Sequence, residues 1–470
     1  MSKDVGKHPQ YYWMDIGLGF GVALIALLLF AYYAYTWRSF ADFKAAIDTC
    51  AEPFCDFASF YYPMGEAIFR TGLPVKGFMY SPFIAILLTV FPSRGLDASL
   101  ALWGILQALF VILYLLLFRR LVPAGRPIQL VFVALVLSSF PLLHTLTWGQ
   151  VSVFTTVAIL GILVVIERDH RAAAAALFAF AVSFKFFPLI FLAPFVVRRD
   201  TRFLLFVAAA CGAFLFVVPG VLLGVSDTLR FYGDLLESYR ASDWIVSNYN
   251  SQHFPHVVLR LAEAAGRDAH DCLPLLSWIS YGIAAANMGL VFLIQRAHLR
   301  YADLWSFHLI FLSIPFALKT SWPVDLVYMS FAQALLAWRL LDGEGTDVAW
   351  KHPYEDTWRK QTLKGRAAVT LFLVTSIVIS NIVFFNLFGD RYHYGFYGFI
   401  FWADLLLLMA SYIELLPPAL RQIRMTSGGN VLSGALRPHE QAGGANMVSI
   451  SKMVVRRPRP AADVVRCDVG

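Results

Sequence analysis

Long apolar runs recur along this 470-residue chain, and they constrain its fold more than any other feature. Several are close to the ~20 residues that a helix needs to cross the hydrocarbon core of a bilayer. Only 15% of the residues are charged and 59% are hydrophobic. Soluble domains carry about one-quarter charged residues. The sequence therefore predicts an all-α polytopic membrane protein.

Basic residues between the apolar runs set the expected orientation. Lys3 and Lys7 precede the first run, so the N-terminus is expected in the cytoplasm. Counting from there gives about 12 hydrophobic passages, with both termini inside. The predicted passages are 16–35, 98–118, 128–143, 150–166, 172–197 (two half-length helices), 203–223, 275–294, 304–318, 324–341, 367–387 and 396–416.

The passages define a transmembrane domain over 1–416. Two outer loops are long enough to hold structure, 37–97 and 224–273. The segment 417–470 contains Gly-Gly pairs, Arg-Pro repeats and little apolar periodicity, so we predict a disordered basic cytoplasmic tail. The basic clusters lie where the positive-inside rule places them, and the net charge of +7 therefore does not indicate nucleic-acid binding.

Cofactor and metal motifs are not evident in the sequence. The five cysteines lack metal-ligand spacing, and the chain has no Walker motif, no dinucleotide-binding glycine loop, no HExxH and no cytoplasmic DxD pair. No metal or cofactor is expected, and an enzyme of this kind would take an activated group from the membrane. Cys50 and Cys55 share the first outer loop, where they either form a short-loop disulfide or remain free thiols.

Asp56 is the first candidate for chemistry, because it stands among aromatic residues in the first outer loop. A general base must be ionised, close to the hydroxyl that it deprotonates and partly shielded from water. A carboxylate held at the bilayer edge by neighbours such as Phe57 and Tyr61 meets these conditions. The alternatives are that Asp56 caps a helix, or that Asp42 or Asp48 in the same loop takes the role.

Lys185 is the second candidate, because it interrupts an apolar run together with Pro188. An ammonium group within such a run is costly unless it has a partner or an aqueous cavity. It suits an anionic ligand such as a lipid-linked phosphate. The alternative is that Lys185 snorkels to the outer interface from the tip of a short hairpin.

Three further segments put polar and aromatic groups at the outer ends of predicted passages. The Trp-Gly-Gln run at 148–150 offers an indole and an amide to a sugar, although aromatic belts also place Trp at this depth. The polar run 247–253 fits carbohydrate recognition or an ordinary polar loop. Asp325, shortly after Trp322, either orients a substrate or pairs with Lys319.

Taken in order, these segments resemble glycosyltransferase family 87, a group of polytopic bacterial enzymes of the C-type superfamily that use polyprenyl-phosphate sugars. The resemblance covers roughly residues 40–340 and rests on order and spacing rather than on one motif. The matching residues are Asp56-Phe57, Tyr61-Tyr62, Gly72, Tyr80-x-Pro82, Trp103, Gly149-Gln150-x-Ser152, Lys185-x-x-Pro188, Asn250-Ser251 and Ser321-Trp322.

The resemblance implies a C-type glycosyltransferase-like transmembrane helix bundle with a structured first periplasmic loop, in the bacterial inner membrane. It implies inverting transfer of a sugar, mannose rather than arabinose, from a polyprenyl-phosphate donor to a glycan or glycolipid acceptor at the periplasmic face. Asp56 would be the general base, and Lys185, followed by Lys319, would bind the donor phosphate. The residues expected to contact substrate are Tyr62, Tyr80, Gln150, Asn250, Ser251, His253, Trp322 and Asp325.

A transporter or flippase of lipid-linked sugars is the main alternative, with Lys185 in its path, and a non-catalytic assembly partner is another. A transporter is expected to carry ionisable groups near mid-membrane and to show repeat symmetry. In this sequence the candidate polar groups cluster at the outer ends of the passages, which favours an enzyme.

Overall fold

The computed structural model describes residues 54–72, 78–240, 244–342, 363–382, 387–388 and 391–435. The chain divides into two compact units, Met1–Arg424 and Met425–Gly470. The described residues form helices and no strand, which confirms the predicted all-α fold. The first predicted passage, 16–35, and the alternative bases Asp42 and Asp48 lie outside the described residues.

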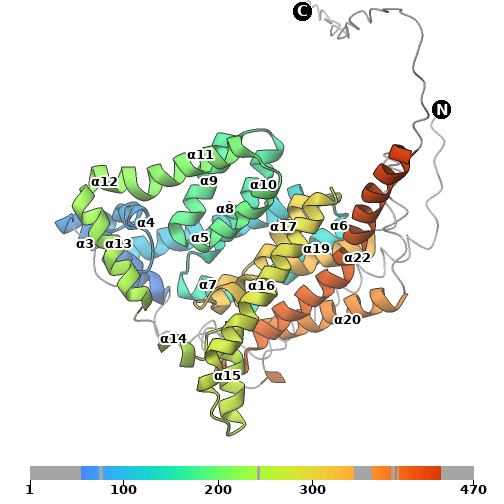
Figure 1. Ribbon diagram of the computed structural model, residues 1–470. Coiled ribbons are helices and arrows are strands. Elements are labelled where there is room, and N and C mark those ends of the chain that lie inside the picture. The colour runs from blue at the N-terminus through green and yellow to red at the C-terminus, as the bar shows by residue number, and fades with distance from the viewer. Residues whose placement is uncertain are drawn as a thin grey trace, which may run out of the picture. The chain divides into compact units, whose positions relative to one another are not determined.

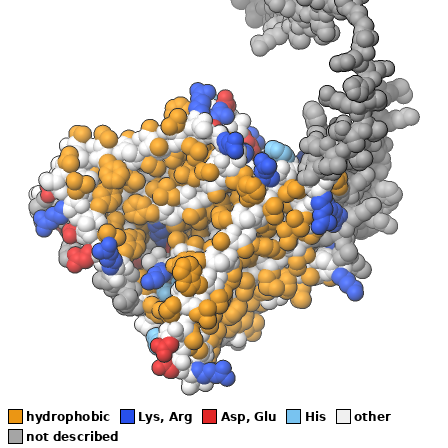
Figure 2. Space-filling view, viewed as in Figure 1, with side chains coloured by type: hydrophobic (Ala, Val, Ile, Leu, Met, Phe, Trp, Pro, Cys, Tyr) orange, Lys and Arg blue, Asp and Glu red, His pale blue; other side chains and the backbone are white. Residues whose placement is uncertain are grey.

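Five helical stretches among the described residues are long and apolar enough to cross a membrane, as expected of a polytopic protein. They are Leu96–Leu121, Thr201–Leu222, His270–Arg296, Pro323–Leu341 and Phe399–Met425. The first three stretches contain α5 (Leu96–Leu121), α11 (Thr201–Gly212) with η5 (Ala213–Val217) and α12 (Val218–Leu222), and α16 (Leu273–Arg296). The last two overlap α19 (Met329–Asp342) and α22 (Phe399–Ala435), which continue beyond them. Large apolar side chains such as Val221 and Trp278 are exposed, and Figure 2 shows a face covered mainly by hydrophobic side chains, as lipid contact requires.

Shorter apolar helices fill the interior. α8 (Ser152–Glu167) packs against α5 and against α9 (Arg171–Phe184), which in turn packs against α11 (Figure 1). All residues from 151 to 160 are buried. The start of α8 is therefore enclosed by protein, where a polar side chain needs a hydrogen-bond partner.

The passage predicted at 128–143 is wrong as a single helix. α6 (Arg126–Ser138) ends before Ser139, whose extended backbone separates it from α7 (Phe140–Trp148). The Ser139 side chain accepts a hydrogen bond from Leu142 N, and Pro141 occupies the first turn of α7, where an N–H is not needed. An apolar run does not show where one helix ends and the next begins.

The chain breaks at Lys185, as the sequence predicts. Lys185 is extended (φ −148°, ψ 142°) after α9, and the chain continues through η4 (Phe187–Leu192) and α10 (Ala193–Val197). Arg171, at the start of α9, lies 3.6 Å from Asp200, which follows α10. The two ends of the segment therefore meet, and Lys185 lies at the tip of a helical hairpin.

Both predicted outer loops contain helices. The first holds η1 (Phe57–Tyr61), α3 (Tyr62–Thr71), α4 (Pro82–Leu87), η2 (Leu88–Val90) and η3 (Pro92–Arg94); the second holds α13 (Val225–Arg240), α14 (Trp244–Ser247), α15 (Phe254–Ala264) and η6 (His270–Cys272). Cys55, at the start of the first described segment, is disulfide-bonded, so the free-thiol alternative is wrong for it. Cys50 lies outside the described residues.

α22 continues past residue 417, where the sequence predicts a disordered tail to begin. The helix passes through Pro417 and Pro418 and ends at Ala435. Leu415 and Ala419, on either side of the prolines, are fully buried. Tertiary packing therefore offsets the hydrogen bonds that the prolines cannot make, and the predicted boundary is too early.

Polar side chains, all buried except the partly exposed Arg339, join α22 to α17 (Ala302–Phe311), to α19 and to the turn before α19. The contacts are Tyr328 Oη to Asp404 Oδ1 (2.8 Å), His308 Nε2 to Ser411 Oγ (2.7 Å) and Arg339 Nε to Glu414 Oε1 (2.7 Å). These six residues are referred to below as the polar seam. Hydrogen bonds between helices hold membrane bundles together where apolar attraction between helices is weak, and the seam fits that role.

Candidate active site

The site is built on the sharp turn between α7 and α8. Gly149 ends α7 in the left-handed region (φ +69°), and a Cβ added there would lie 2.8 Å from Phe54 Cβ and 3.1 Å from Trp103 Nε1. Two side chains of α5 hold the turn from the other side: Trp103 Nε1 donates to Gly149 O (2.9 Å), and Gln107 Nε2 donates to Gln150 O (2.7 Å). Only glycine fits this position without displacing a neighbour. We refer to residues 150–152 as the polar turn.

Asp56 is bound to the polar turn. Gln150 Nε2 donates to Asp56 Oδ2, and the aspartate is buried, with 8% of its surface exposed. Asp56 stands at the position that precedes η1, but its side chain makes no capping bond there. The structure therefore does not support the helix-cap alternative, because the carboxylate is directed to Gln150 instead.

Two tyrosines fix the orientation of the Gln150 amide. The hydroxyls of Tyr61 and Tyr80 lie 2.7 Å apart, at 2.9 Å and 3.3 Å from Gln150 Oε1. Burial raises the pKa of both hydroxyls above the ordinary value, and the nearby Asp56 charge raises it further, so both stay neutral donors. With its oxygen facing the tyrosines, the amide must present its NH₂ group to Asp56.

Tyr61 reaches this network because η1 is a π-helical turn. The N–H of Tyr62 bonds to Phe57 O, five residues earlier, which brings Tyr61 onto the same side as Asp56. In an ordinary α-helix Phe60 would share that side, yet Phe60 is 61% exposed. Sequence spacing therefore missed Tyr61 as a site residue, since α-helical periodicity does not include a π-turn.

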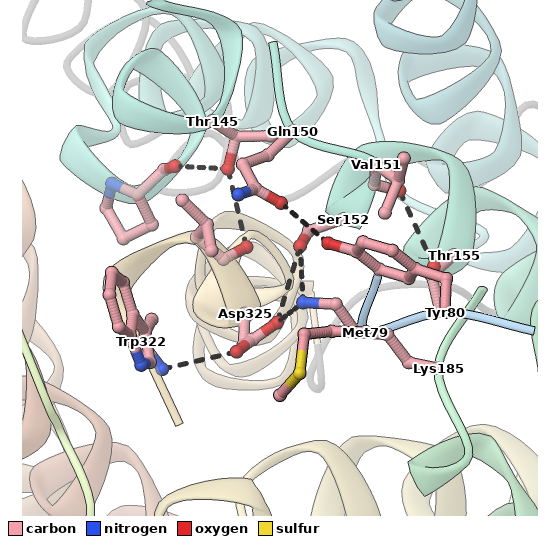
Figure 3. A network of polar contacts seen from close by, with 12 residues as sticks. Met79, Tyr80, Thr145, Gln150, Val151, Ser152, Thr155, Lys185, Trp322 and Asp325 are labelled. Atoms are coloured by element: carbon pink, nitrogen blue, oxygen red, sulfur yellow. Dashed lines mark hydrogen bonds and ion pairs between the residues drawn. The ribbon is translucent and has the colours of Figure 1, made fainter. Parts of the chain in front are cut away.

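The other end of the polar turn contacts an ion pair. Figure 3 shows Lys185 directed toward Asp325 and Ser152: its Nζ pairs with Asp325 Oδ1 and donates to Ser152 Oγ at 3.2 Å. Asp325 Oδ1 also lies 3.4 Å from Ser152 Oγ, and Asp325 Oδ2 accepts the Trp322 N–H at 3.2 Å. The predicted pairing of Asp325 with Lys319 is wrong. Lys319 is exposed, whereas the hairpin tip brings Lys185 to the buried carboxylate on η7 (Pro323–Leu326).

Aromatic and cationic groups adjoin the polar turn on the α7 side. Trp148 lies 6.2 Å from Trp322 between ring centroids, and the Arg391 guanidinium lies 5.5 Å from the centre of the Trp148 ring. Arg391 also contacts His144 Nε2 (3.4 Å) and Asn250 Oδ1 (3.5 Å). Arg391 begins α21 (Arg391–Phe396), far along the chain from the other site residues, and no local pattern predicts it.

Ser251 and His253 belong to a separate buried network next to α15. Ser251 Oγ lies 2.7 Å from His256 Nδ1, His253 Nδ1 lies 3.0 Å from Pro315 O, and Arg260 donates to Ser251 O at 2.6 Å. Burial lowers the pKa of His253 to about 4 and that of His256 to about 3. Burial also lowers the pKa of Arg260 to about 10. Both imidazoles are therefore neutral at physiological pH.

The structure thus brings together six of the predicted site residues and separates four others from them. Hydrogen bonds and one ion pair through the polar turn join Asp56, Tyr80, Gln150, Lys185, Asp325 and Trp322. Tyr62 packs its ring against Phe57 at 6.3 Å, Lys319 is exposed, and Ser251 and His253 lie in the α15 network. Asn250 reaches the site through Arg391. Among the described residues, no three His, Cys, Asp or Glu side chains are grouped to hold a metal ion.

Comparison with known proteins identifies one family. The model of glycosyltransferase family 87 matches residues 78–321, just over half of the chain. Neither a curated protein nor a solved structure matches the chain. The matched range contains Tyr80, Gln150 and Lys185, whereas Asp56 precedes it and Asp325 follows it.

Proposed function

Because the chain belongs to glycosyltransferase family 87 and is a membrane glycosyltransferase, we propose that it transfers a sugar from a polyprenyl-phosphate donor to a glycan or glycolipid hydroxyl. The observation that carries this proposal is the polar turn itself. Gln150 binds a carboxylate, and Ser152, two residues later, binds a lysine ammonium. A base for the acceptor and a cation for the leaving phosphate are thus held by one short segment.

Asp56 is the proposed general base. An amide N–H donated to a carboxylate favours its ionised form, and the amide of Gln150 is oriented to supply one. Asp56 would take the proton of the acceptor hydroxyl while the acceptor oxygen forms a bond to the anomeric carbon. A single displacement of this kind inverts the configuration at that carbon.

Lys185 is the proposed partner of the donor phosphate. When the bond between the anomeric carbon and the phosphate oxygen breaks, the electron pair leaves with the phosphate, and an ammonium group stabilises the charge that develops there. Lys185 has 20% of its side chain exposed, so it is accessible to a ligand. Lys319, an exposed lysine outside the contacts of the polar turn, is the second candidate.

The remaining substrate contacts are proposed from position and chemistry. Trp322 and Tyr80 flank the polar turn, and indole and phenol rings stack on sugar faces or bond to sugar hydroxyls. Asn250 contributes through Arg391. Tyr62, Ser251 and His253 are proposed as further substrate contacts. We propose mannose rather than arabinose as the sugar.

The proposed site faces the periplasm of a bacterial inner membrane. α8 begins at the polar turn and ends at Glu167, which lies 3.5 Å from Arg120 at the end of α5. Arg168 and Arg171 follow directly, so basic residues gather at the end opposite the polar turn. The positive-inside rule assigns such an end to the cytoplasm. The polar turn, Asp56 and Lys185 would then lie on the outer side, and both termini inside.

Replacing Asp56 by Asn tests the proposal directly. The assay measures transfer of radiolabelled mannose from polyprenyl-phosphate mannose into the glycolipid and glycan fractions of membranes, with arabinosyl donor run in parallel. We expect Asp56→Asn to lower the rate about 10²–10⁴-fold, the usual contribution of a general base. Asp97→Asn, a matched change at an exposed carboxylate, should leave the rate unchanged. Full activity of Asp56→Asn would rule out Asp56 as the general base.

A further inference from the structure

A carboxylate of the chain itself occupies a position suited to a phosphate. The groups around Asp325 are the Lys185 ammonium, the Ser152 hydroxyl and the Trp322 backbone N–H, the last two at 3.4 Å and 3.2 Å. Because the Ser152 oxygen accepts a hydrogen bond from Lys185, its own hydrogen is available to donate. An ammonium, a hydroxyl and a backbone N–H are the donors with which proteins bind phosphate oxygens.

The ion pair joins three separate elements. Lys185 lies at the tip of the α9–η4 hairpin, Ser152 begins α8, and Asp325 lies on the one-turn η7. Figure 3 shows their side chains meeting. The Lys185 side chain is 20% exposed and that of Asp325 only 6%. Lys185 therefore keeps some access from outside, whereas Asp325 is almost fully enclosed by protein.

Resting on the donor-phosphate role proposed above for Lys185, we propose that Asp325 is an internal competitor of the donor phosphate. Its carboxylate holds Lys185 and Ser152 when no donor is bound, and gives up these contacts when the lipid phosphate enters. After transfer, the carboxylate returns to Lys185 and displaces the product. Two anions in contact with one ammonium repel each other, so phosphate binding and the Lys185–Asp325 pair disfavour each other.

An internal competitor of this kind would promote release of the product. The donor phosphate is a diester with one negative charge, whereas the product is a monoester, which carries about −1.5 to −2 at neutral pH. A bare lysine site would hold the product more tightly than the donor, because the product is the more highly charged. Competition from Asp325 weakens the affinity of the site for both, and so keeps the product from blocking the next turnover.

An asparagine at position 325 separates this role from a structural one. Asp325→Asn keeps a side-chain oxygen that accepts the Trp322 N–H, but it removes the charge that holds Lys185. Asp325→Ala removes both the side-chain oxygen and the charge. A purely structural role predicts that both variants weaken phosphate binding, whereas internal competition predicts that Asp325→Asn strengthens it.

The experiment measures the Kd of a short-chain polyprenyl monophosphate for the full-length protein purified in detergent. We expect about a tenfold lower Kd for Asp325→Asn, because couplings between close charges change affinity by an order of magnitude or more. Lys185→Gln should raise the Kd. The double variant Lys185→Gln/Asp325→Asn should not show the lower Kd expected for Asp325→Asn alone. Asp303→Asn, which breaks the 2.6 Å pair with Arg198 elsewhere, should leave the Kd unchanged.

The outcomes distinguish this inference from the proposed function. If Lys185→Gln weakens binding but Asp325→Asn does not strengthen it, internal competition is wrong and the phosphate role of Lys185 stands. If Lys185→Gln leaves the Kd unchanged, the phosphate role is wrong, and internal competition falls with it. Should Asp325→Asn fail to fold, Asp325→Ser offers the Trp322 N–H an oxygen and supplies the same comparison.

Discussion

The polar turn and the polar seam are both sets of buried polar side chains in an apolar protein, but they are built in different places. The partners of the polar turn lie where helices end: Lys185 between α9 and η4, and Asp325 on the short η7. The seam residues Asp404 and Ser411 lie within the continuous α22. Side chains at helix ends have room to change partners, whereas those inside a packed helix pair have fixed neighbours.

Exposure follows the same division. The Lys185 side chain is 20% exposed, whereas Asp404 and Ser411 are fully buried and His308 is 1% exposed. These three side chains are therefore closed to a ligand, whereas Arg339, at the end of the seam, keeps 16% of its side chain exposed. The hydrogen bonds of the seam serve to hold α22 against α17 and α19. Burial of a charged group in a membrane protein does not by itself identify a functional site. Placement at a helix break, together with residual access, is the better criterion.

The largest effect is expected from Gly149→Ala in the turn that supports the site. The left-handed backbone (φ +69°) and the contact of 2.8 Å with Phe54 Cβ force the turn to move. A shift of about 1 Å at a catalytic group costs on the order of 10²-fold in rate. We therefore expect transfer activity to fall at least about 10²-fold, measured with the mannosyl donor in purified protein.

Gly161→Ala is the matched control for that variant. Gly161 lies within α8, and a Cβ there would meet only Leu177 Cδ1 at 3.6 Å, an ordinary contact. Alanine in a helix interior is favoured over glycine by about 1 kcal/mol. This variant should keep wild-type activity and a melting temperature at least as high. Equal activity in both variants would show that the geometry of the polar turn does not matter for transfer.

A pair of Tyr→Phe substitutions compares the two regions by removing the same hydroxyl from each. Tyr328→Phe leaves the buried Asp404 carboxylate without its 2.8 Å donor, at a cost of about 1–3 kcal/mol in the free energy of unfolding. Tyr61→Phe leaves Tyr80 to bond to Gln150, so its effect on stability should be smaller. The activity of the folded protein should fall only in Tyr61→Phe.

Thermal unfolding in detergent and transfer activity per folded molecule measure the two effects separately. If Tyr328→Phe lowered activity while leaving the melting temperature unchanged, the assignment of the polar seam to a structural role would be wrong. A second check is the double variant Tyr328→Phe/Asp404→Leu. Because it removes both partners, it should recover much of the stability that Tyr328→Phe loses.

The sequence predicts those site residues that differ clearly from their neighbours along the chain. Lys185 is conspicuous because it interrupts an apolar run, and the chain does break there. Gln150 follows Trp148 and Gly149 at the end of a passage, and it does bind Asp56. Charges within apolar sequence are rare and costly, so Lys185 stands out without any knowledge of the fold.

Other parts depend on geometry that the sequence does not contain. The π-turn of η1 moves Tyr61, rather than Phe60, to the side of Asp56. Asp325 is close to Lys319 along the chain, yet it pairs with Lys185 from a distant hairpin. Arg391 joins the site across the whole fold. Local periodicity predicts which helices form, but partner choice depends on how they pack.

The last comparison, whose effect is smallest at physiological pH, concerns the buried pair His253 and His256, of which the sequence predicts His253 as a substrate contact. Burial lowers their pKa values from 6.5 to about 4 and about 3. Below pH 6.5 the unfolded chain therefore takes up protons that the folded protein does not. The free energy of unfolding should fall as the pH decreases from 6.5 toward 4, by up to about 1.4 kcal/mol per pH unit for each histidine.

Thermal unfolding in detergent between pH 7 and pH 4 measures this slope, and His256→Gln, which no longer titrates, should reduce it. If the pair acts only as packing, like the seam, the donor lipid will leave the slope unchanged. If His253 contacts substrate, bound donor or acceptor will raise the melting temperature least near pH 4, because a ligand that covers the neutral imidazole binds more weakly once His253 takes up a proton. The second outcome would extend the active site from the polar turn to α15.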